Sequence, residues 1–94
     1  MKLYGAIDLH SNNNVTVLTD ETDKVVYQKR LTNHLPLILE QLSPYASTIE
    51  GIVVESTYNW YWLVDGLMDK GHPFVHVRLL SGRADRHNSG FFIE

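Results

Sequence analysis

The stretch over residues 51–62 constrains the fold of this chain more than any other. Its apolar run at 52–54 contains two valines, which is typical of a short strand buried in a parallel sheet and covered on both faces. The run closes on Glu55, and we expect an aromatic-rich helix to leave directly from that acid. A second apolar run, at residues 4–7, closes in the same way on Asp8. Open α/β sheets carry their chemistry beyond the carboxyl ends of the strands, so these two acids are the first candidates for a site.

The first 30 residues predict an antiparallel meander of three strands. Residues 15–19 alternate between polar and apolar and are rich in β-branched side chains, as strands are. The asparagine-rich turn before them has a chemistry that tolerates left-handed backbone. The expected strands are residues 2–9, 15–19 and 25–27, and the expected turns are residues 10–14 and 20–23.

Beyond residue 32 the hydrophobic period changes from that of a strand to that of a helix. The first helical face consists of Leu35, Ile38, Leu39, Leu42 and Ala46. Thr32 or Asn33 is suited to cap this helix, whose first turn tolerates Pro36. Ser43-Pro44 should end or kink the helix, because the residue before a proline disfavours helical backbone.

A second helix is expected after the strand at 51–54. Its apolar face consists of Trp60, Leu63, Val64, Leu67 and Met68. Gly71 is suited to end this helix, since glycine adopts the left-handed conformation common after a helix C-terminus. Pro73 then opens a last strand at 74–77, which completes the order β-β-β-α-β-α-β.

This element order predicts a ribonuclease H-like α/β fold, a mixed five-stranded sheet with helices on its faces, in which right-handed crossovers follow the meander. The first and fourth strands of that topology are adjacent and parallel. We therefore expect Asp8 and Glu55 to lie side by side at one edge of the sheet, within reach of one metal ion. A chain of 94 residues is long enough for one such domain with a modest core.

The composition excludes several classes of protein. Without cysteine, the chain has no disulfide framework, thiolate metal site or cysteine nucleophile. No apolar run approaches the roughly 18 residues of a membrane span, and no signal peptide precedes the first strand, so we expect a cytoplasmic protein with no membrane partner. The net charge of −3 argues against a free-standing nucleic-acid binder, but not against one domain of a larger nucleic-acid enzyme, whose metal-binding carboxylates make it acidic.

Two neighbouring carboxylates at the end of a sheet have two chemical uses. They can share a proton in acid–base catalysis, or they can hold a hard divalent cation such as Mg²⁺ or Mn²⁺. An alternative for Glu55 is a structural role at a helix N-terminus, which contributes only about 0.3–1 kcal/mol. Asp8 is harder to explain structurally, because an acid between Ile7 and Leu9 in an apolar strand needs a partner or a function.

Three segments carry a resemblance to a known family: Gly-Ala-Ile-Asp-Leu-His-Ser at 5–11, Arg-Leu-Thr-Asn at 30–33, and the aromatic-rich stretch at 55–67. They are similar to the N-terminal domain of DEDD-type insertion-sequence transposases, which are related to the Piv and MooV invertases and have a RuvC-like, ribonuclease H-like catalytic domain. The resemblance implies that Asp8 is the first D and Glu55 the E of the acidic tetrad that binds Mg²⁺. It also implies DNA strand exchange, a guide RNA as a partner, and a separate C-terminal domain that supplies a serine for cleavage.

The resemblance runs from about residue 3 to Val77 and then stops. We therefore divide the chain into a truncated transposase-like domain at 1–78 and a divergent tail at 79–94. The family continues into a Lys-rich segment and an Asp-x-x-Asp-Ala motif with the last two acids, and the surroundings of Asp85 fit neither of them. With half of the tetrad and no serine-bearing domain, the chain is expected to be inactive as a transposase by itself.

Other side chains are candidates for nucleic-acid contact. Basic residues offer contacts to phosphates, and aromatic residues offer surfaces on which bases stack. The candidates are Lys29, Arg30, Tyr58 and Tyr61, with Arg78, Arg83 and Arg86 as further basic residues. We expect Trp60 to be buried, Tyr61 to face solvent and His10 to make hydrogen bonds in its turn. The apolar run at 91–93 should pack on the domain or on a second copy of the chain.

Two alternatives stay open. One half of an actin-like or sugar-kinase-like ATPase also places an Asp at the end of its first strand, but it needs a glycine-rich phosphate loop, and residues 10–14 contain no glycine. The other alternative is a non-catalytic interaction module, a homodimer formed through surface that its parent protein covers. A dimer without metal affinity would favour this second alternative.

Overall fold

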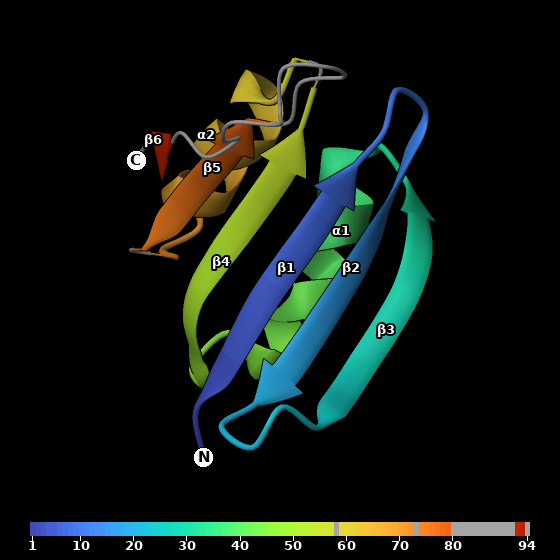
Figure 1. Ribbon diagram of the computed structural model, residues 1–94. Helices are drawn as coiled ribbons and strands as arrows, with labels where there is room; N and C mark the ends of the chain where they lie inside the picture. The colour runs from blue at the N-terminus through green and yellow to red at the C-terminus, as the bar shows by residue number, and fades with distance from the viewer. Residues whose placement is uncertain (58, 73, 80–91, 94) are drawn as a thin grey trace.

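A computed structural model of the protein describes residues 1–57, 59–72, 74–79 and 92–93, the last two as backbone only. The elements are β1 (Leu3–Leu9), β2 (Asn13–Asp20), β3 (Val25–Thr32), α1 (Leu35–Leu42), the 3₁₀ helix η1 (Ser43–Tyr45), β4 (Ile49–Ser56), α2 (Tyr61–Asp69), β5 (Val75–Leu79) and β6 (Phe92–Ile93). The strands form one sheet with the order β3-β2-β1-β4-β5-β6 (Figure 1).

The five predicted strands and two predicted helices occur in the predicted order, so the α/β fold class is confirmed. β1 pairs in parallel with β4, and β4 with β5, whereas β1–β2 and β2–β3 are antiparallel. Several elements are longer than the hydrophobic pattern indicated, and the third strand runs on to Thr32. Residues 92–93, in the apolar run expected to pack on the domain, add a short strand antiparallel to β5, while residue 91 lies outside the described residues.

Both helices lie on the same side of the sheet, behind it in Figure 1. We call this side the covered face and the other side the open face. β1 shows the difference, because Leu3, Gly5, Ile7 and Leu9 are buried whereas the residues between them are exposed. The expectation that the strand at 52–54 is covered on both faces therefore differs from the structure, in which Val53 is only half-buried on the open face.

The hydrophobic core lies between the covered face and the two helices. The buried helical residues are Ile38 and Leu42 in α1 and Leu63, Val64 and Leu67 in α2. Trp60 packs against this core but is only half-buried, whereas full burial was expected. Two predicted members of the helical faces are exposed. Ala46 lies beyond the end of α1, and Met68 is 47% exposed because it points about 100° around the helix from Leu67.

The start of α1 differs from the prediction. His34 is the N-cap residue, and neither Thr32 nor Asn33 caps the helix with its side chain. The Asn33 side chain instead donates a hydrogen bond to the carbonyl oxygen of His10, 2.9 Å away. The proline in the first turn and the end of the helix before Pro44 are as expected.

Left-handed backbone occurs at the end of α2 and in the turn between β2 and β3. Gly71, which follows α2, has a φ of 97°, as its predicted role requires. Among the described non-glycine residues only Asp23 has a positive φ, 68°, so the turn at 10–14 does not use the left-handed backbone that its asparagines tolerate. In the same turn, hydrogen bonds from the Thr22 hydroxyl and the Lys24 backbone N–H lower the pKa of the Asp20 carboxyl.

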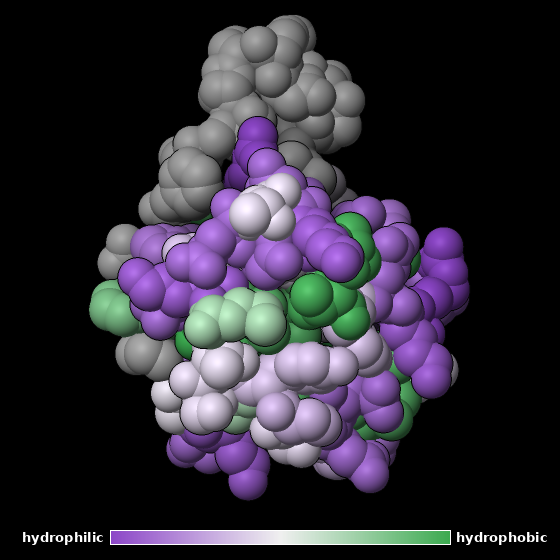
Figure 2. Space-filling view, turned by 90° about the horizontal axis from the view of Figure 1, so that it is seen from below, coloured by the Kyte–Doolittle hydropathy of each residue, from purple (hydrophilic) through white to green (hydrophobic). Residues whose placement is uncertain are grey.

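Figure 2 shows the end of the molecule at which β1, β4 and β5 begin. Its surface is mostly hydrophilic, with smaller hydrophobic areas among the charged residues. Exposed apolar side chains near strand starts include Met1 before β1, Phe74 before β5 and Val25 at the start of β3. The two candidate acids lie at the other end of the sheet, where β1 and β4 finish.

Candidate functional site

Asp8 and Glu55 are direct neighbours on adjacent strands. β1 and β4 run in parallel, and their register pairs Asp8 with Glu55. Side chains paired in this way point to the same side of a sheet, and neighbouring strands lie only about 4.8 Å apart. The expectation that the topology brings these two acids together at the carboxyl ends of their strands is therefore confirmed.

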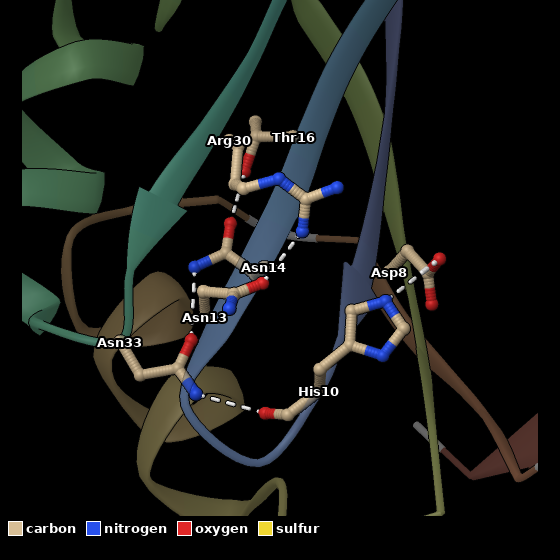
Figure 3. Close-up of polar contacts among 7 residues, drawn as sticks. All are labelled: Asp8, His10, Asn13, Asn14, Thr16, Arg30 and Asn33. Atoms are coloured by element: carbon tan, nitrogen blue, oxygen red, sulfur yellow. Dashed lines mark hydrogen bonds and ion pairs between the residues drawn. The ribbon is translucent and has the colours of Figure 1, made fainter.

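Asp8 lies on the open face and is not buried. Because side chains alternate along a strand, Ile7 and Leu9 point into the core while Asp8 points away from it. Its side chain is 51% exposed, and its Oδ2 lies 3.3 Å from Nε2 of His10 (Figure 3). The expectation that an acid between Ile7 and Leu9 needs a partner or a function is met by this contact with His10.

Glu55 also lies within its strand, not at the start of a helix. α2 begins only at Tyr61, so neither the expected helix leaving from Glu55 nor the alternative of a helix N-terminal acid is correct. The Glu55 side chain is 33% exposed, and its Oε2 accepts a hydrogen bond from Nη1 of Arg78 at 3.2 Å. Arg78 is the register partner of Glu55 on β5. In the sequence, Arg78 is only one of several scattered basic residues, and its pairing with Glu55 was not predicted.

The register extends this pair into a row across the open face. Arg30 pairs with Val15, Val15 with Asp8, Asp8 with Glu55, and Glu55 with Arg78. We call the four charged members, Arg30, Asp8, Glu55 and Arg78, the charged row. Two carboxylates therefore lie at its centre, with one guanidinium group toward each edge of the sheet.

A buried polar network lies behind the turn that joins β1 to β2, next to Asp8 (Figure 3). Asn14 and Thr16 are fully buried on the covered face, and the Thr16 hydroxyl donates to Oδ1 of Asn14 at 2.7 Å. The Asn14 amide donates to Oδ1 of Asn33 at 3.1 Å, and Asn33 in turn donates to the His10 carbonyl oxygen. This chain of hydrogen bonds fixes the backbone of His10, whose ring contacts Asp8. The sequence pattern predicted Asn14 in a turn and Asn33 as a possible helix cap, and it did not predict this network.

The predicted nucleic-acid contacts among the described residues do not share one surface. Lys29 pairs with buried Thr16, so its side chain belongs to the helix side of the sheet, whereas Arg30 lies on the open face and donates to Oδ1 of Asn13 at 2.9 Å. Tyr61 is 62% exposed, as expected, and its ring stacks on that of Trp60 with the centroids 4.1 Å apart. Tyr58, together with Arg83 and Arg86, lies outside the described residues.

The acid pair matches a divalent cation in ligand type but not in ligand number. Mg²⁺ prefers oxygen ligands, and Asp8 and Glu55 offer two carboxylates. Within residues 1–57, 59–72 and 74–79, no three His, Asp or Glu side chains gather closely enough to hold a metal ion. The pair therefore fits a hydrated ion that takes one or two ligands from the protein and the rest from water or a phosphate group, which is the usual situation of Mg²⁺ in proteins.

The order of the strands and the placement of the helices define a ribonuclease H-like α/β fold. Among solved structures, the chain is similar to an exopolyphosphatase from Cytophaga hutchinsonii ATCC 33406, with a TM-score of 0.50 and 13% identity over 83% of this chain and 34% of that one. It is also similar to the Argonaute of Marinitoga piezophila in complex with a 5′ OH guide RNA, with a TM-score of 0.48 and 14% identity over 83% of this chain and 16% of that one.

These similarities have a limited meaning. The chain spans about a third of the exopolyphosphatase, and at 13% identity the likeness shows the fold alone. No protein-family model matches the sequence, and no curated protein matches it. The resemblance to transposases therefore stays a prediction. In the part of the chain that the structure describes, none of the helices has the length and apolar character needed to cross a membrane.

Proposed function

We propose that this chain is the N-terminal part of a ribonuclease H-like enzyme that transfers phosphoryl groups in nucleic acid, of the DEDD transposase type, with Asp8 and Glu55 as two of its metal-binding acids. The observation that carries the proposal is the register of Asp8 with Glu55 on parallel strands, at the carboxyl ends and on the open face. Sequence similarity at residues 5–11, 30–33 and 55–67 supports the choice of family. DNA and a guide RNA as partners, and a cytoplasmic location, belong to the same proposal.

The described side chains have distinct roles in this proposal. Asp8 and Glu55 would hold the divalent ion, which would supply electrostatic stabilisation of the oxygens in a phosphoryl transfer. Asp8 and Glu55 supply oxygen ligands on a surface that a large substrate can reach, since their side chains are 51% and 33% exposed. His10 holds the Asp8 carboxylate in place, and the Asn33 contact to the His10 carbonyl fixes that histidine.

We further propose that the chain alone does not catalyse strand exchange. Two-metal phosphoryl transfer needs three or four acids. The charged row contains two, and no group of three possible metal ligands occurs among the described residues. The resemblance to the family assigns two of its four acids, Asp8 and Glu55, within residues 3–77. The proposed activity therefore requires groups beyond those of residues 1–79.

A titration of the ¹⁵N-labelled chain with Mn²⁺, followed by NMR, tests this proposal. We expect selective broadening of the amide signals around Asp8 and Glu55, and loss of that broadening in the D8N and E55Q variants. The matched control is E50Q, because Glu50 is an exposed acid at the opposite end of the same strand as Glu55. If signals near Asp8 and Glu55 do not broaden at millimolar Mn²⁺, the assignment of a metal site to this pair is wrong.

A second candidate function is a homodimer without catalytic activity. The observation that favours it is the uncovered face of the sheet, where Tyr4 is 44% exposed and Val15, Val17 and Val53 are only half-buried. Sedimentation velocity over a range of protein concentrations tests this candidate. A concentration-dependent dimer that dissociates in a Val17→Lys variant, together with no response to Mn²⁺, would favour the interaction module over the enzyme.

A further inference from the structure

We propose that Arg78 is a phosphate-binding residue of this site. In the absence of a cation Arg78 is paired with Glu55, and it is released to bind phosphate when a cation binds the Glu55 carboxylate. This inference rests on the proposed function and adds a ligand to the same site: a phosphodiester group bound by Arg78 beside the acid pair. The observation behind it is the contact of Nη1 of Arg78 with Oε2 of Glu55 at 3.2 Å, on the open face and in register with Asp8.

The Arg78 guanidinium has hydrogen-bonding capacity that Glu55 does not use. An arginine carries five N–H donors in a planar fork that suits the two oxygens of a phosphate. Only one nitrogen of Arg78 contacts Glu55, and Glu55 is its single side-chain partner among the described residues. The side chain is 45% exposed, so the remaining donors are accessible from the open face.

The position of Arg78 in the charged row places it close enough to the two acids to contact a phosphate bound beside them. Glu55 lies between Asp8 and Arg78 in the register, and each step is one strand spacing of about 4.8 Å. A phosphate that shares an ion with Asp8 and Glu55 therefore lies within reach of the long Arg78 side chain. Such a phosphate restores to Arg78 the negative partner that it loses when Glu55 turns to the ion.

This exchange of partners couples the two ligands. A divalent cation competes with Arg78 for Glu55, which weakens cation binding when no phosphate is present. An exposed ion pair of this kind corresponds to a factor of up to about fivefold in a binding constant. Phosphate removes the competition, and by thermodynamic reciprocity the cation strengthens phosphate binding by the same factor.

Arg30 provides the matched control. It lies on the same face, but β2 separates it from the acid pair, and its contact is to the neutral amide of Asn13. Removal of Arg30 takes away the same charge without releasing either carboxylate. An effect that comes only from the overall charge of the face would appear in both variants.

The test is the Mg²⁺ affinity of the ¹⁵N-labelled chain, measured from amide shifts near Asp8 and Glu55, with and without dimethyl phosphate as a phosphodiester probe. We expect R78A to bind Mg²⁺ about two- to fivefold more tightly than the natural chain when the probe is absent. We expect dimethyl phosphate to raise Mg²⁺ affinity in the natural chain and in R30A but not in R78A. An R78K variant, which keeps the charge and loses the planar fork, should keep the competition with Mg²⁺ and lose most of the phosphate effect.

The outcomes separate this inference from the proposed function. Equal Mg²⁺ affinity in the natural chain and R78A, or a phosphate effect that survives in R78A, overturns the role of Arg78 and leaves the metal site intact. An absence of any Mg²⁺ response near Asp8 and Glu55 in all variants overturns the proposed metal site and this inference together. Each variant is first checked for folding by the dispersion of its amide signals.

Discussion

The two faces of the sheet differ in role: the covered face forms the core, and the open face carries the candidate site. On β1, the side chains of Leu3, Ile7 and Leu9 are at most 3% exposed and pack under the helices, whereas Asp8 on the other face is half exposed. The same strand therefore supplies both the core and the candidate site, one residue apart. The comparison teaches that stability and binding should respond to different substitutions even at adjacent positions.

The sharpest test of this comparison is the pair Ile7→Ala and Asp8→Asn. Ile7 is 1% exposed in the core, and its truncation should lower the free energy of unfolding by about 2–5 kcal/mol through lost burial and a cavity. Asp8→Asn should change it by less than about 0.5 kcal/mol and should abolish the response to Mn²⁺. Urea unfolding monitored by tryptophan fluorescence measures the change in the free energy of unfolding of both variants. Similar losses in the two variants would contradict the division between the faces.

The second test concerns the polar residues that lie on the covered face. Asn14→Ala removes the acceptor of the Thr16 hydroxyl and the donor to Asn33, which leaves buried groups without partners. We expect a loss of about 1–3 kcal/mol. The neighbouring Asn13→Ala on the open face is the control and should cost less than about 0.5 kcal/mol. Equal urea midpoints for the two variants would show that the network contributes nothing.

The smallest expected effect is a pH dependence from His72. This residue is 6% exposed, lines a cavity of about 510 Å³ beside α1, and burial lowers the pKa of its imidazole. As the pH falls below about 6.5, the unfolded chain binds a proton that the folded chain resists, so this contribution to stability is complete above that pH and is lost below it. Thermal unfolding between pH 7.5 and pH 5.5 measures the loss. It should shrink in His72→Gln and persist in His34→Gln, whose histidine is exposed.

The sequence predicted the sheet and the proximity of the two acids because both depend on patterns that are local. Apolar runs mark β1, β4 and β5, and the element order then determines which strands are neighbours. The face to which Asp8 and Glu55 point follows from the alternation of side chains along each strand, which is also a local signal. The start of α2 also had a local signal, since the Asn59 side chain accepts a hydrogen bond from the backbone N–H of Tyr61.

Other features depend on residues that are distant in the sequence and could not be predicted in this way. Asn14 looks like a turn residue until its partners from β3 and the segment before α1 are known. Arg78 looks like a surface residue until the register places it beside Glu55. Polar side chains carry no periodic signal of their own, so their partners emerge only with the tertiary structure.

The parallel pairing of β1 with β4 also dictates when the site can exist during folding. The β2–β3 hairpin can form early because a short turn joins its strands, whereas Asp8 meets Glu55 only after the chain has crossed over through α1. Closing so long a loop is entropically unfavourable, which makes such contacts slow to form. A partly folded chain with its meander in place has one acid without the other. Any ligand of the pair therefore selects the fully assembled chain and shifts the folding equilibrium toward it.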